Sequence, residues 1–325
     1  MLNTLALAVD SGRHSTKGIF KINGILQRLM FRTKGQKVEN LSIEPAPNSF
    51  LIEMNGESFL VGDMVSEQRT SYEIDKTSID HLLSTRLMTC LYLEKLGVRE
   101  TGIPINLAVN LPLNMYKNSV LKNEHERFIV NDYRPISMNV NGKSYIFRYD
   151  KCIILPEGTG SIYSNINDYR DKRVSVFDIG SLNVNFATFQ SLVPILDSLN
   201  VSTQGSNILR SKVSDALTTK YNVSISDSDC EQILKDGYLF INGKKIDDSG
   251  EIIDSIVKSH IEEIINLAKS HGVAFNNTTL LFCGGGSILM KNEILSQLPS
   301  AIIDSAGSFA NALSFLRVLE AKNLA

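Results

Sequence analysis

The sequence has few cysteines and no cysteine pair of the kind that binds zinc. Four cysteines stand alone at positions 90, 152, 230 and 283, and no C-x-x-C motif occurs. The five histidines form no cluster with ligand spacing. These absences predict a protein without structural zinc, whose thiols serve as small apolar side chains in a reducing cytoplasm.

Long apolar runs and an excess of basic residues are absent too. No uninterrupted apolar stretch reaches the roughly 20 residues of a membrane helix, and the N-terminus lacks the basic start and apolar core of a secretion signal. The formal net charge of −2 argues against a generally basic nucleic-acid-binding surface and leaves only a local patch as an alternative. We therefore expect a soluble, cytoplasmic protein with no membrane partner and no direct sequence-specific DNA binding.

Low-complexity linkers and charge runs are missing as well, so closely packed domains are expected. The length of 325 residues exceeds that of a typical single-core domain and predicts two domains.

Apolar alternation predicts several strands in the first quarter, with Asn55-Gly56 as a hairpin turn. A helix is expected from about Ile79 to Leu96, stopped by Gly97, and another from about Ser249 to His271. The mixture predicts an α/β protein.

One segment is weakly repeated. "LALAVDSGRHSTKGIFK" and "VSVFDIGSLNVNFATFQ" share an apolar strand, an aspartate, one residue, a glycine, a polar turn and a returning strand. Asp10 thus corresponds to Asp178, and Gly12 to Gly180. One such hairpin is ordinary, whereas two in one chain suggest a duplicated domain with a shared cleft.

These turns have the chemistry of phosphate-binding loops. Backbone N–H groups in a tight turn cradle phosphate oxygens, and glycine permits close approach of the ligand. An aspartate at a strand end can hold hydrated Mg²⁺, and Lys17 can neutralise phosphate charge. The cluster Gly284-Gly285-Gly286-Ser287 closes a further apolar strand, where the backbone can lie against a base or ribose. A plain turn is the alternative for each motif alone, but three glycine-marked strand ends together favour a nucleotide.

The order of the motifs resembles the actin/Hsp70/sugar-kinase ATPase superfamily. "VDSGRHSTKG" is similar to its first phosphate loop, "LPEGTGSIYS" to its first connecting segment, "VFDIGSLNVNFATF" to its second phosphate loop, "LLFCGGGS" to its adenosine motif and "DSAGSFANALSF" to its second connecting segment. Within the superfamily, "LAVNLPLNMY", "ESFLVGDMV" and "ILPEG" look most like the ParM-type plasmid-segregation actins, although archaeal actin relatives share these features.

The resemblance implies a two-domain actin-like fold, a duplicated RNase H-like α/β architecture with the nucleotide cleft between the domains. Domain I would span residues 1–160, with the C-terminal segment 305–325 returning to it. Domain II would span residues 161–304.

The resemblance also implies site residues. Glu157 would position the attacking water, the alternative being an acid at a helix start. Asp10 and Asp178 would hold Mg²⁺ through water, with Asp178 also catalytic, the alternative being a turn-stabilising role. The expected nucleotide-binding residues are Asp10, Ser11, Gly12, Arg13, Ser15, Lys17, Gly180, Ser181, Asn183, Gly205, Asn207, Arg210, Gly284, Gly285, Gly286 and Ser287.

Several of these assignments have plain alternatives. Lys17 could be a solvated surface lysine, and Arg13 could point to solvent rather than to phosphate. Ser206 or Asn207 could simply cap a helix. The apolar run Phe309, Leu313, Leu316 and Leu319 is expected to pack in a domain core rather than on a membrane surface.

The sequence departs from the family pattern in its second loop. Asn183 and Asn185 stand where the family usually carries Thr and Asp, so the loop has one acid fewer, which would slow hydrolysis or change how Mg²⁺ is held. Arg13 and His14 replace small residues of the actin loop. His81 and His260 are expected to be surface or capping groups, and Cys283 a small residue beside the nucleotide.

The implied function is that of a filament-forming ATPase that uses ATP, or GTP, with Mg²⁺. Its filaments would segregate plasmid DNA through a small DNA-binding adaptor bound to a centromere-like site. A non-plasmid cytoskeletal actin is the main alternative. A small-molecule kinase lacks support because no sugar-binding constellation occurs, and a chaperone ATPase would need a substrate-binding domain and linker.

Overall fold

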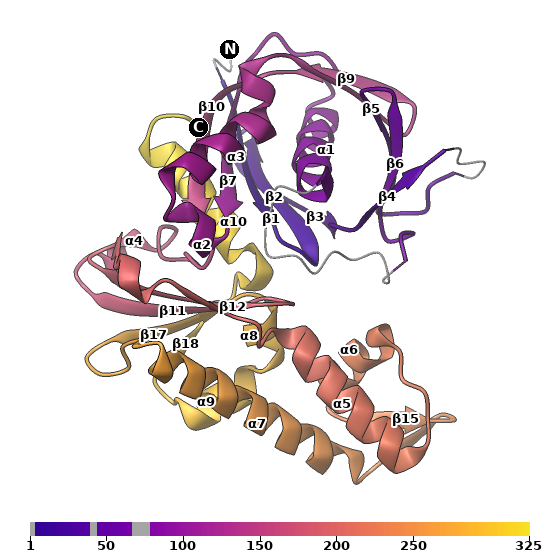
Figure 1. The fold of residues 1–325 in the computed structure, drawn as a ribbon, viewed down its shortest axis with the longest axis vertical. Coiled ribbons are helices and arrows are strands. Elements are labelled where there is room, and N and C mark those ends of the chain that lie inside the picture. Colours follow the sequence, from indigo (N-terminus) through magenta and orange to yellow (C-terminus); the bar gives the residue numbers. More distant parts are fainter. Residues whose placement is uncertain (1–3, 40–43, 67–78) are drawn as a thin grey trace. The chain divides into compact units, whose positions relative to one another are not determined.

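The computed structural model describes residues 4–39, 44–66 and 79–325. The chain forms two compact units, one of Met1–Ser164 with Phe309–Ala325 and the other of Asn165–Ser308. The domain boundaries expected from the sequence were 160/161 and 304/305. The first unit is discontinuous in sequence because its last helix comes from the C-terminus (Figure 1).

The first unit contains a mixed sheet with the strand order β10-β7-β1-β2-β3. Its strands are β1 (Leu5–Ser11), β2 (Ser15–Ile22), β3 (Ile25–Arg32), β7 (Ile105–Leu111) and β10 (Tyr149–Pro156). The first three strands form an antiparallel meander, whereas β7 runs parallel to β1 and β10 runs parallel to β7. The carboxyl ends of β1, β7 and β10 therefore lie at one edge of the sheet.

A second, antiparallel sheet of this unit has the order β4-β6-β5-β8-β9. Its strands are β4 (Gly35–Val38), β5 (Ser49–Met54), β6 (Glu57–Gly62), β8 (Ile136–Val140) and β9 (Lys143–Phe147). Asn55 and Gly56 have φ angles of 54° and 80° and join β5 to β6, as the Asn-Gly signal predicted.

Helix α1 (Ile79–Lys95) lies between the two sheets (Figure 1). Its buried residues face all sides, which is the pattern of a helix enclosed by its domain. The predicted helix over 79–96 is confirmed, and Gly97 ends it with a φ of 74°. The short helix α2 (Leu113–Tyr116), the helix α3 (Ser119–Val130) and the 3-10 turn η2 (Asn131–Tyr133) follow β7.

The two faces of the first sheet pack on different helices. Leu7 and Val9 belong to the core around α1, whereas Ala8 and Ala108 pack with helix α10 (Ala310–Ala321). Because side chains alternate along a strand, Asp10 and Asn110 share the α10 face, and Ser11 faces α1. The C-terminal apolar run lies in this core, as expected, with Leu316 and Leu319 buried.

The second unit has a sheet of order β13-β12-β11-β17-β18, with β14 also paired to β12. Its strands are β11 (Arg173–Ile179), β12 (Val184–Gln190), β13 (Val193–Pro194), β14 (Asn200–Ser202), β17 (Thr279–Cys283) and β18 (Ile302–Ile303). The other elements are α4 (Ile166–Tyr169), η3 (Leu196–Ser198), α5 (Ser206–Tyr221), α6 (Asp227–Asp236), the hairpin β15 (Leu239–Ile241) and β16 (Lys244–Ile246), α7 (Ser249–Ser270), α8 (Gly285–Leu289), α9 (Lys291–Gln297) and η4 (Gly307–Phe309).

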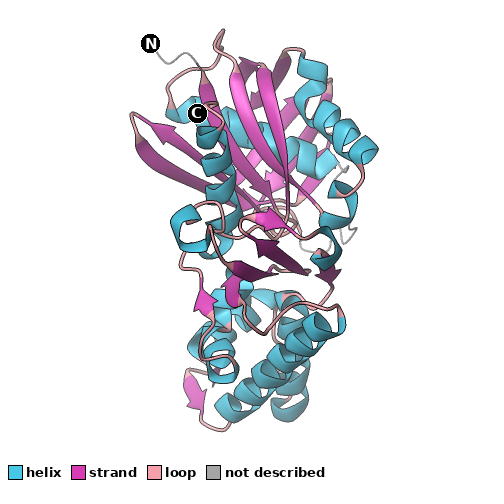
Figure 2. Ribbon diagram, turned by 90° about the vertical axis from the view of Figure 1, so that its left-hand side faces the viewer, coloured by secondary structure: helices cyan, strands magenta, loops and turns pink. Residues whose placement is uncertain are grey.

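Helices α5 and α7 pack against each other and against one face of this sheet (Figures 1 and 2). Phe177 and Phe186 of the sheet share a core with Leu209 of α5 and Ile261 and Ile264 of α7. The predicted long helix over 249–271 and the strand before the glycine cluster are confirmed.

The sequence repeat corresponds to a structural repeat. Asp10 lies opposite Lys17 in the β1–β2 hairpin, and Asp178 lies opposite Asn185 in the β11–β12 hairpin. Each aspartate thus faces the residue seven positions further along. In each unit a strand parallel to the first strand of the hairpin lies beside it, β7 in one and β17 in the other. Asn185 therefore occupies in the second hairpin the place that Lys17 has in the first.

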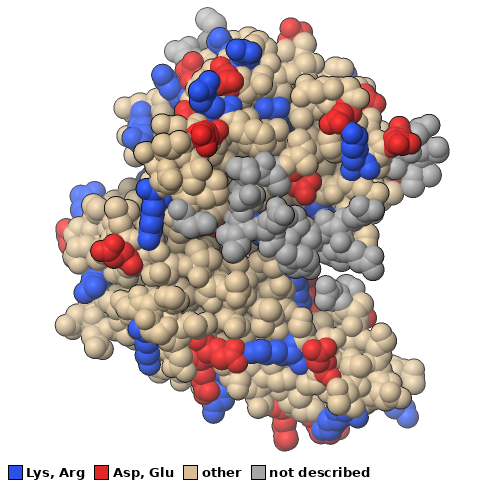
Figure 3. Space-filling view, viewed as in Figure 1, with Lys and Arg blue, Asp and Glu red and all other residues tan. Residues whose placement is uncertain are grey.

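Within the described ranges, no helix combines the length and the apolar character that crossing a membrane requires. Lys and Arg side chains are interspersed with Asp and Glu over the face of the described residues seen in Figure 3.

Candidate functional site

The turn between β1 and β2 consists of Gly12, Arg13 and His14. The carbonyl oxygen of Gly12 accepts a hydrogen bond from Thr33 Oγ1 at 2.5 Å, and that of His14 accepts one from the Thr33 N–H at 3.1 Å. A Cβ on Gly12 would lie 2.9 Å from Lys17 Nζ and from the Ser15 carbonyl oxygen, so a side chain does not fit there. Arg13 is half-buried. Thr33, the first residue after β3, therefore holds the backbone of the first predicted phosphate loop in place through these two hydrogen bonds.

Lys17 lies beside Asp10, with its Nζ 3.7 Å from Asp10 Oδ2. Its side chain is only 13% exposed, so the alternative of a solvated surface lysine is wrong. Asp10 is buried at the carboxyl end of β1. One negative and one positive group are thus placed together at the mouth of the turn.

A side chain that the sequence analysis did not select connects this pair to Glu157. Asn110, buried at the end of β7, donates from Nδ2 to Asp10 Oδ1 at 2.7 Å and to Glu157 Oε1 at 3.2 Å. Its Oδ1 accepts the backbone N–H of Ser11 at 3.0 Å. The available signal was an asparagine within the otherwise apolar strand "INLAVNL".

Glu157 follows β10 directly, and its backbone N–H donates to the Leu111 carbonyl oxygen at 3.0 Å. It is half-buried. The alternative of an acid at a helix start is wrong, because the next helix, α4, begins only at Ile166.

The prediction that His81 is a surface group is wrong. His81 is 4% exposed, and its Nδ1 lies 3.0 Å from Ser11 Oγ in a hydrogen bond. His260 is fully buried in α7, so neither histidine is a surface group. His81 is buried because α1, which carries it, is enclosed by two sheets.

The loop after Glu157 is fastened to the C-terminal helix α10. Asn311 Oδ1 accepts hydrogen bonds from the Gly160 N–H at 2.9 Å and from Thr159 Oγ1 at 3.3 Å. Ser314 Oγ donates to the Gly160 carbonyl oxygen at 2.6 Å. The two segments that resemble the connecting segments of the superfamily are therefore in direct contact.

The second predicted phosphate loop, Gly180–Asn183, is covered by the start of α5. The N–H groups of Ser206 and Asn207 donate to the carbonyl oxygens of Gly180 at 3.0 Å and Ser181 at 2.9 Å. Gly205 is the N-cap of α5, and the Oδ1 of Asn207 accepts the backbone N–H of Ile208 in the first turn at 2.9 Å. A Cβ on Gly205 would lie 2.2 Å from the Ser181 carbonyl oxygen.

Arg210, on the first turns of α5, also reaches this loop. Its Nη2 donates to Ser181 Oγ at 3.3 Å, and its Nη1 lies 3.9 Å from Glu231 Oε2. The structure thus brings Ser181, Gly205, Asn207 and Arg210 together within the second unit.

Asp178 and Asn185 are nearly buried and lie opposite each other, so their side chains share one face of the sheet. The Oδ1 of Asn185 has no hydrogen-bond partner among the described residues. A carboxylate and a free amide oxygen on one face are the hard oxygen groups that hydrated Mg²⁺ uses, so these residues fit the predicted ion. Within the described residues, no three His, Cys, Asp or Glu side chains gather as a direct metal cluster.

The glycine cluster closes β17 beside Asp178. Gly284 has a φ of 85°, and a Cβ there would lie 2.6 Å from Asp178 Oδ1. A Cβ on Gly286 would lie 2.4 Å from Ile179 Cγ2, whereas one on Gly285 would meet nothing. Ser287 is buried and donates from Oγ to the Gly284 carbonyl oxygen at 2.8 Å. Cys283, also buried, lies opposite Asp178 in the parallel ladder.

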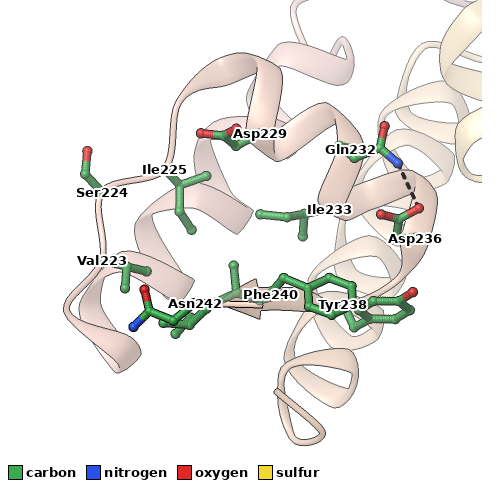
Figure 4. Close-up of a pocket in the computed structure, with 12 residues that line it drawn as sticks. Val223, Ser224, Ile225, Asp229, Gln232, Ile233, Asp236, Tyr238, Phe240 and Asn242 are labelled. Atoms are coloured by element: carbon green, nitrogen blue, oxygen red, sulfur yellow. Dashed lines mark hydrogen bonds between the residues drawn. The ribbon is translucent and has the colours of Figure 1, made fainter. Parts of the chain in front are cut away.

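A separate groove of about 350 Å³ lies between α6 and β15 (Figure 4). Ile225 and Ile233 point into it, and Tyr238 and Phe240 lie along its other side. Asp236 at its rim accepts a hydrogen bond from Gln232 Nε2 at 2.8 Å. None of the site residues predicted from the sequence lines this groove.

Comparison with known proteins agrees with this fold. The profile of a family described as the N-terminal domain of actin-like proteins matches residues 8–160. No curated protein sequence matches the chain significantly. Among solved structures, the archaeal actin homologue Ta0583 aligns over 98% of this chain and 100% of its own at a TM-score of 0.78 and 17% identity.

Two filament structures are similar as well. The Alp12 filament subunit aligns over 99% of both chains at a TM-score of 0.73 and 23% identity. The subunit of a 15-stranded ParM filament from Clostridium botulinum aligns over 98% of this chain and 100% of its own, at 0.71 and 17%. The expected actin-like α/β fold is confirmed. The chain therefore has the fold of actin-like proteins, ParM subunits included, and its residues 8–160 match the family of actin-like N-terminal domains.

Proposed function

We propose that the chain binds ATP or GTP with Mg²⁺, hydrolyses it, and assembles into filaments whose lifetime depends on the bound nucleotide. The observation that carries the proposal is the pair of hairpins in equal register, each with a buried aspartate at the carboxyl end of its first strand and a glycine turn beyond it. An archaeal relative of the same fold has been solved in complex with ADP.

In this proposal the first loop and Lys17 bind phosphate oxygens, through backbone N–H groups and charge respectively. The second loop, braced by Arg210, binds phosphate in the same way. Asp10 and Asp178 hold Mg²⁺ through its water ligands, and Asn185 Oδ1 accepts a hydrogen bond from one of those waters. Mg²⁺, when bound, neutralises charge on the phosphates. The glycine cluster provides backbone surface for the nucleoside.

Glu157 orients the attacking water by accepting its hydrogen bonds. The water oxygen bonds to the γ-phosphorus as the bond from that phosphorus to the β,γ-bridging oxygen breaks, giving the diphosphate and inorganic phosphate. Positioning of the reacting groups contributes most of the rate enhancement in such reactions. The hydrogen bond from the Glu157 backbone N–H to the Leu111 carbonyl oxygen is therefore part of the catalytic arrangement.

The test is right-angle light scattering with Mg-ATP, Mg-GTP or no nucleotide, with phosphate release followed in parallel. Scattering should rise with nucleotide and decay as phosphate appears. Glu157→Ala should still assemble, yet its filaments should persist because hydrolysis is at least about 100-fold slower. Glu53→Ala, an exposed acid on β5, is the control and should behave like the wild type. Phosphate release with flat scattering at every concentration would favour a small-molecule kinase instead.

We further propose that the filaments separate plasmid copies in the cytoplasm through a small DNA-binding adaptor at a centromere-like site. The likeness to ParM filaments supports this, whereas the likeness to an archaeal actin homologue favours a non-plasmid cytoskeletal role. Retention of an unstable plasmid that carries the gene and its flanking DNA separates the two. Retention should exceed that of the empty plasmid and should fall with Glu157→Ala; equal loss of all three plasmids would support the cytoskeletal role.

A further inference from the structure

Asn110 lies between two carboxylates because of the order of the strands. β7 is placed between β1 and β10, and all three run parallel. Val9 pairs with Val109, so Asp10, near the end of β1, lies beside Asn110. Leu155 pairs with Asn110 on the other side, which brings Glu157 to the same edge two residues later. The order of the strands therefore places Asp10 and Glu157 on opposite sides of the Asn110 side-chain amide.

The chemistry of its three partners determines the orientation of that amide. The Ser11 N–H can only donate, so it requires Oδ1, at 3.0 Å. Ionised carboxylates can only accept, so Asp10 and Glu157 require Nδ2, at 2.7 and 3.2 Å. One side chain thus satisfies the loop and both carboxylates, and at 0% exposure water has no access to replace it.

We infer that Asn110 is a positioning residue for hydrolysis, which aligns the water-orienting Glu157 with the magnesium-side Asp10 and with the first phosphate loop. Without the shared donor, two carboxylates that both approach the position of Asn110 Nδ2 to within 3.2 Å repel each other, and Glu157 turns away from its catalytic orientation. The inference rests on the proposed function, because it assumes that Glu157 orients the attacking water.

The chain offers a matched control on the same strand. Asn106 is also buried and has the same side-chain direction as Asn110, four residues earlier. Its Nδ2 donates to the Leu324 carbonyl oxygen at 2.8 Å, at the opposite end of the sheet from the two carboxylates. Replacing either asparagine removes a buried amide from β7, but only Asn110 contacts Asp10 and Glu157.

The experiment is a double-mutant cycle on the full chain, with single-turnover phosphate release as the readout. Asn110→Ala should lower the rate at saturating nucleotide at least about tenfold, and Asn106→Ala less than about twofold. In a Glu157→Ala background, Asn110→Ala should lower the rate by less than about threefold, because there is no carboxylate left to align. An equal factor in both backgrounds would overturn the inference.

Binding of a fluorescent ATP analogue, measured with Mg²⁺ and with a chelator, gives a readout besides activity. Its Kd should change by less than about threefold in Asn110→Ala under both conditions, since orientation of Glu157 affects the reaction step and not ground-state binding. If the affinity falls as much as the rate, Asn110 merely supports the loop and the inference fails.

A near-isosteric variant covers the case in which Asn110→Ala does not fold. Asn110→Asp retains an acceptor for the Ser11 N–H but cannot donate to Asp10 and Glu157. It should also lose at least about tenfold in rate, and wild-type turnover by this variant would overturn the inference. Failure of the proposed function is recognised separately, because then the wild type releases no phosphate or Glu157→Ala leaves its rate unchanged.

Discussion

The backbone N–H of Ser206 donates a hydrogen bond to the carbonyl oxygen of Gly180 at 3.0 Å. The first turn of α5 is thereby joined to the second predicted phosphate loop. Helix N-termini leave N–H groups without intrahelical partners, and here loop carbonyl groups accept the N–H groups of Ser206 and Asn207. This arrangement requires the helix start to approach the loop closely, and Gly205 permits it.

Gly205→Ala should therefore displace the second loop. The added Cβ would lie 2.2 Å from the Ser181 carbonyl oxygen, so backbone must move, at a cost of about 1–3 kcal/mol in the free energy of unfolding. Nucleotide affinity, measured by calorimetry, should fall at least about tenfold. Gly102→Ala is the control because an added Cβ there meets no atom within 4 Å. Equal affinities for the two variants would contradict the assignment of the loop.

Lys17→Met should weaken nucleotide binding by about 10- to 100-fold, the effect of losing a charge-assisted hydrogen bond of about 1.5–3 kcal/mol. Lys21→Met, on the same strand, is the matched control. The side chain of Lys21 is exposed and pairs with Glu320, away from the turn. Titration calorimetry with Mg-ATP checks this, and a loss of affinity in Lys21→Met as large as that in Lys17→Met would show a general charge effect instead.

Asn311→Ala should slow phosphate release, because the loop after Glu157 loses its fastening to α10. The Gly160 N–H would be left buried without its acceptor, at a cost of about 1–3 kcal/mol in the free energy of unfolding. Urea unfolding and phosphate release measure the two effects. Arg317→Ala, on the exposed side of the same helix, should change stability by less than about 0.5 kcal/mol. If Asn311→Ala is destabilised but releases phosphate at the wild-type rate, the contact between this loop and α10 does not contribute to catalysis.

His260 should make stability depend on pH. Burial, and secondarily the charge of Lys212, lowers the pKa of His260 to about 4 from 6.5, while Glu263 acts in the opposite direction. Because the unfolded chain binds this proton more readily, the stabilisation is complete above pH 6.5 and is lost as pH falls toward 4, by at most about 3 kcal/mol.

His260→Leu should remove that part of the pH dependence. Unfolding by urea between pH 7 and pH 4.5 should show a flatter profile for this variant than for the wild type. His271→Leu, at the exposed end of the same helix, should retain the wild-type slope. Parallel profiles for wild type and His260→Leu would mean that His260 is protonated without cost in the folded state.

Local patterns were sufficient for much of the architecture. Asn55-Gly56 identified its hairpin because few residues tolerate two successive positive φ angles. The order of strand, aspartate and glycine predicted both loops and drew attention to Lys17, whereas Glu157 was predicted from the resemblance of "LPEGTGSIYS" to a connecting segment. His81 and Asn110 were misjudged or missed because their roles depend on neighbours that are distant in sequence, Ser11 for the one and Asp10 and Glu157 for the other.

Local sequence specifies strands, helices and glycine turns, since alternation, caps and positive φ angles act over a few residues. Three features come from the packing of the folded chain instead: β7 separates β1 from β10, α1 is buried on every side, and α10 returns to hold the loop after Glu157. These contacts join residues that are distant in sequence, from 47 positions for Asn110 and Glu157 to 151 for Gly160 and Asn311. Their pairing is selected by which strands share a register and which faces share a core, and the local sequence does not contain that information.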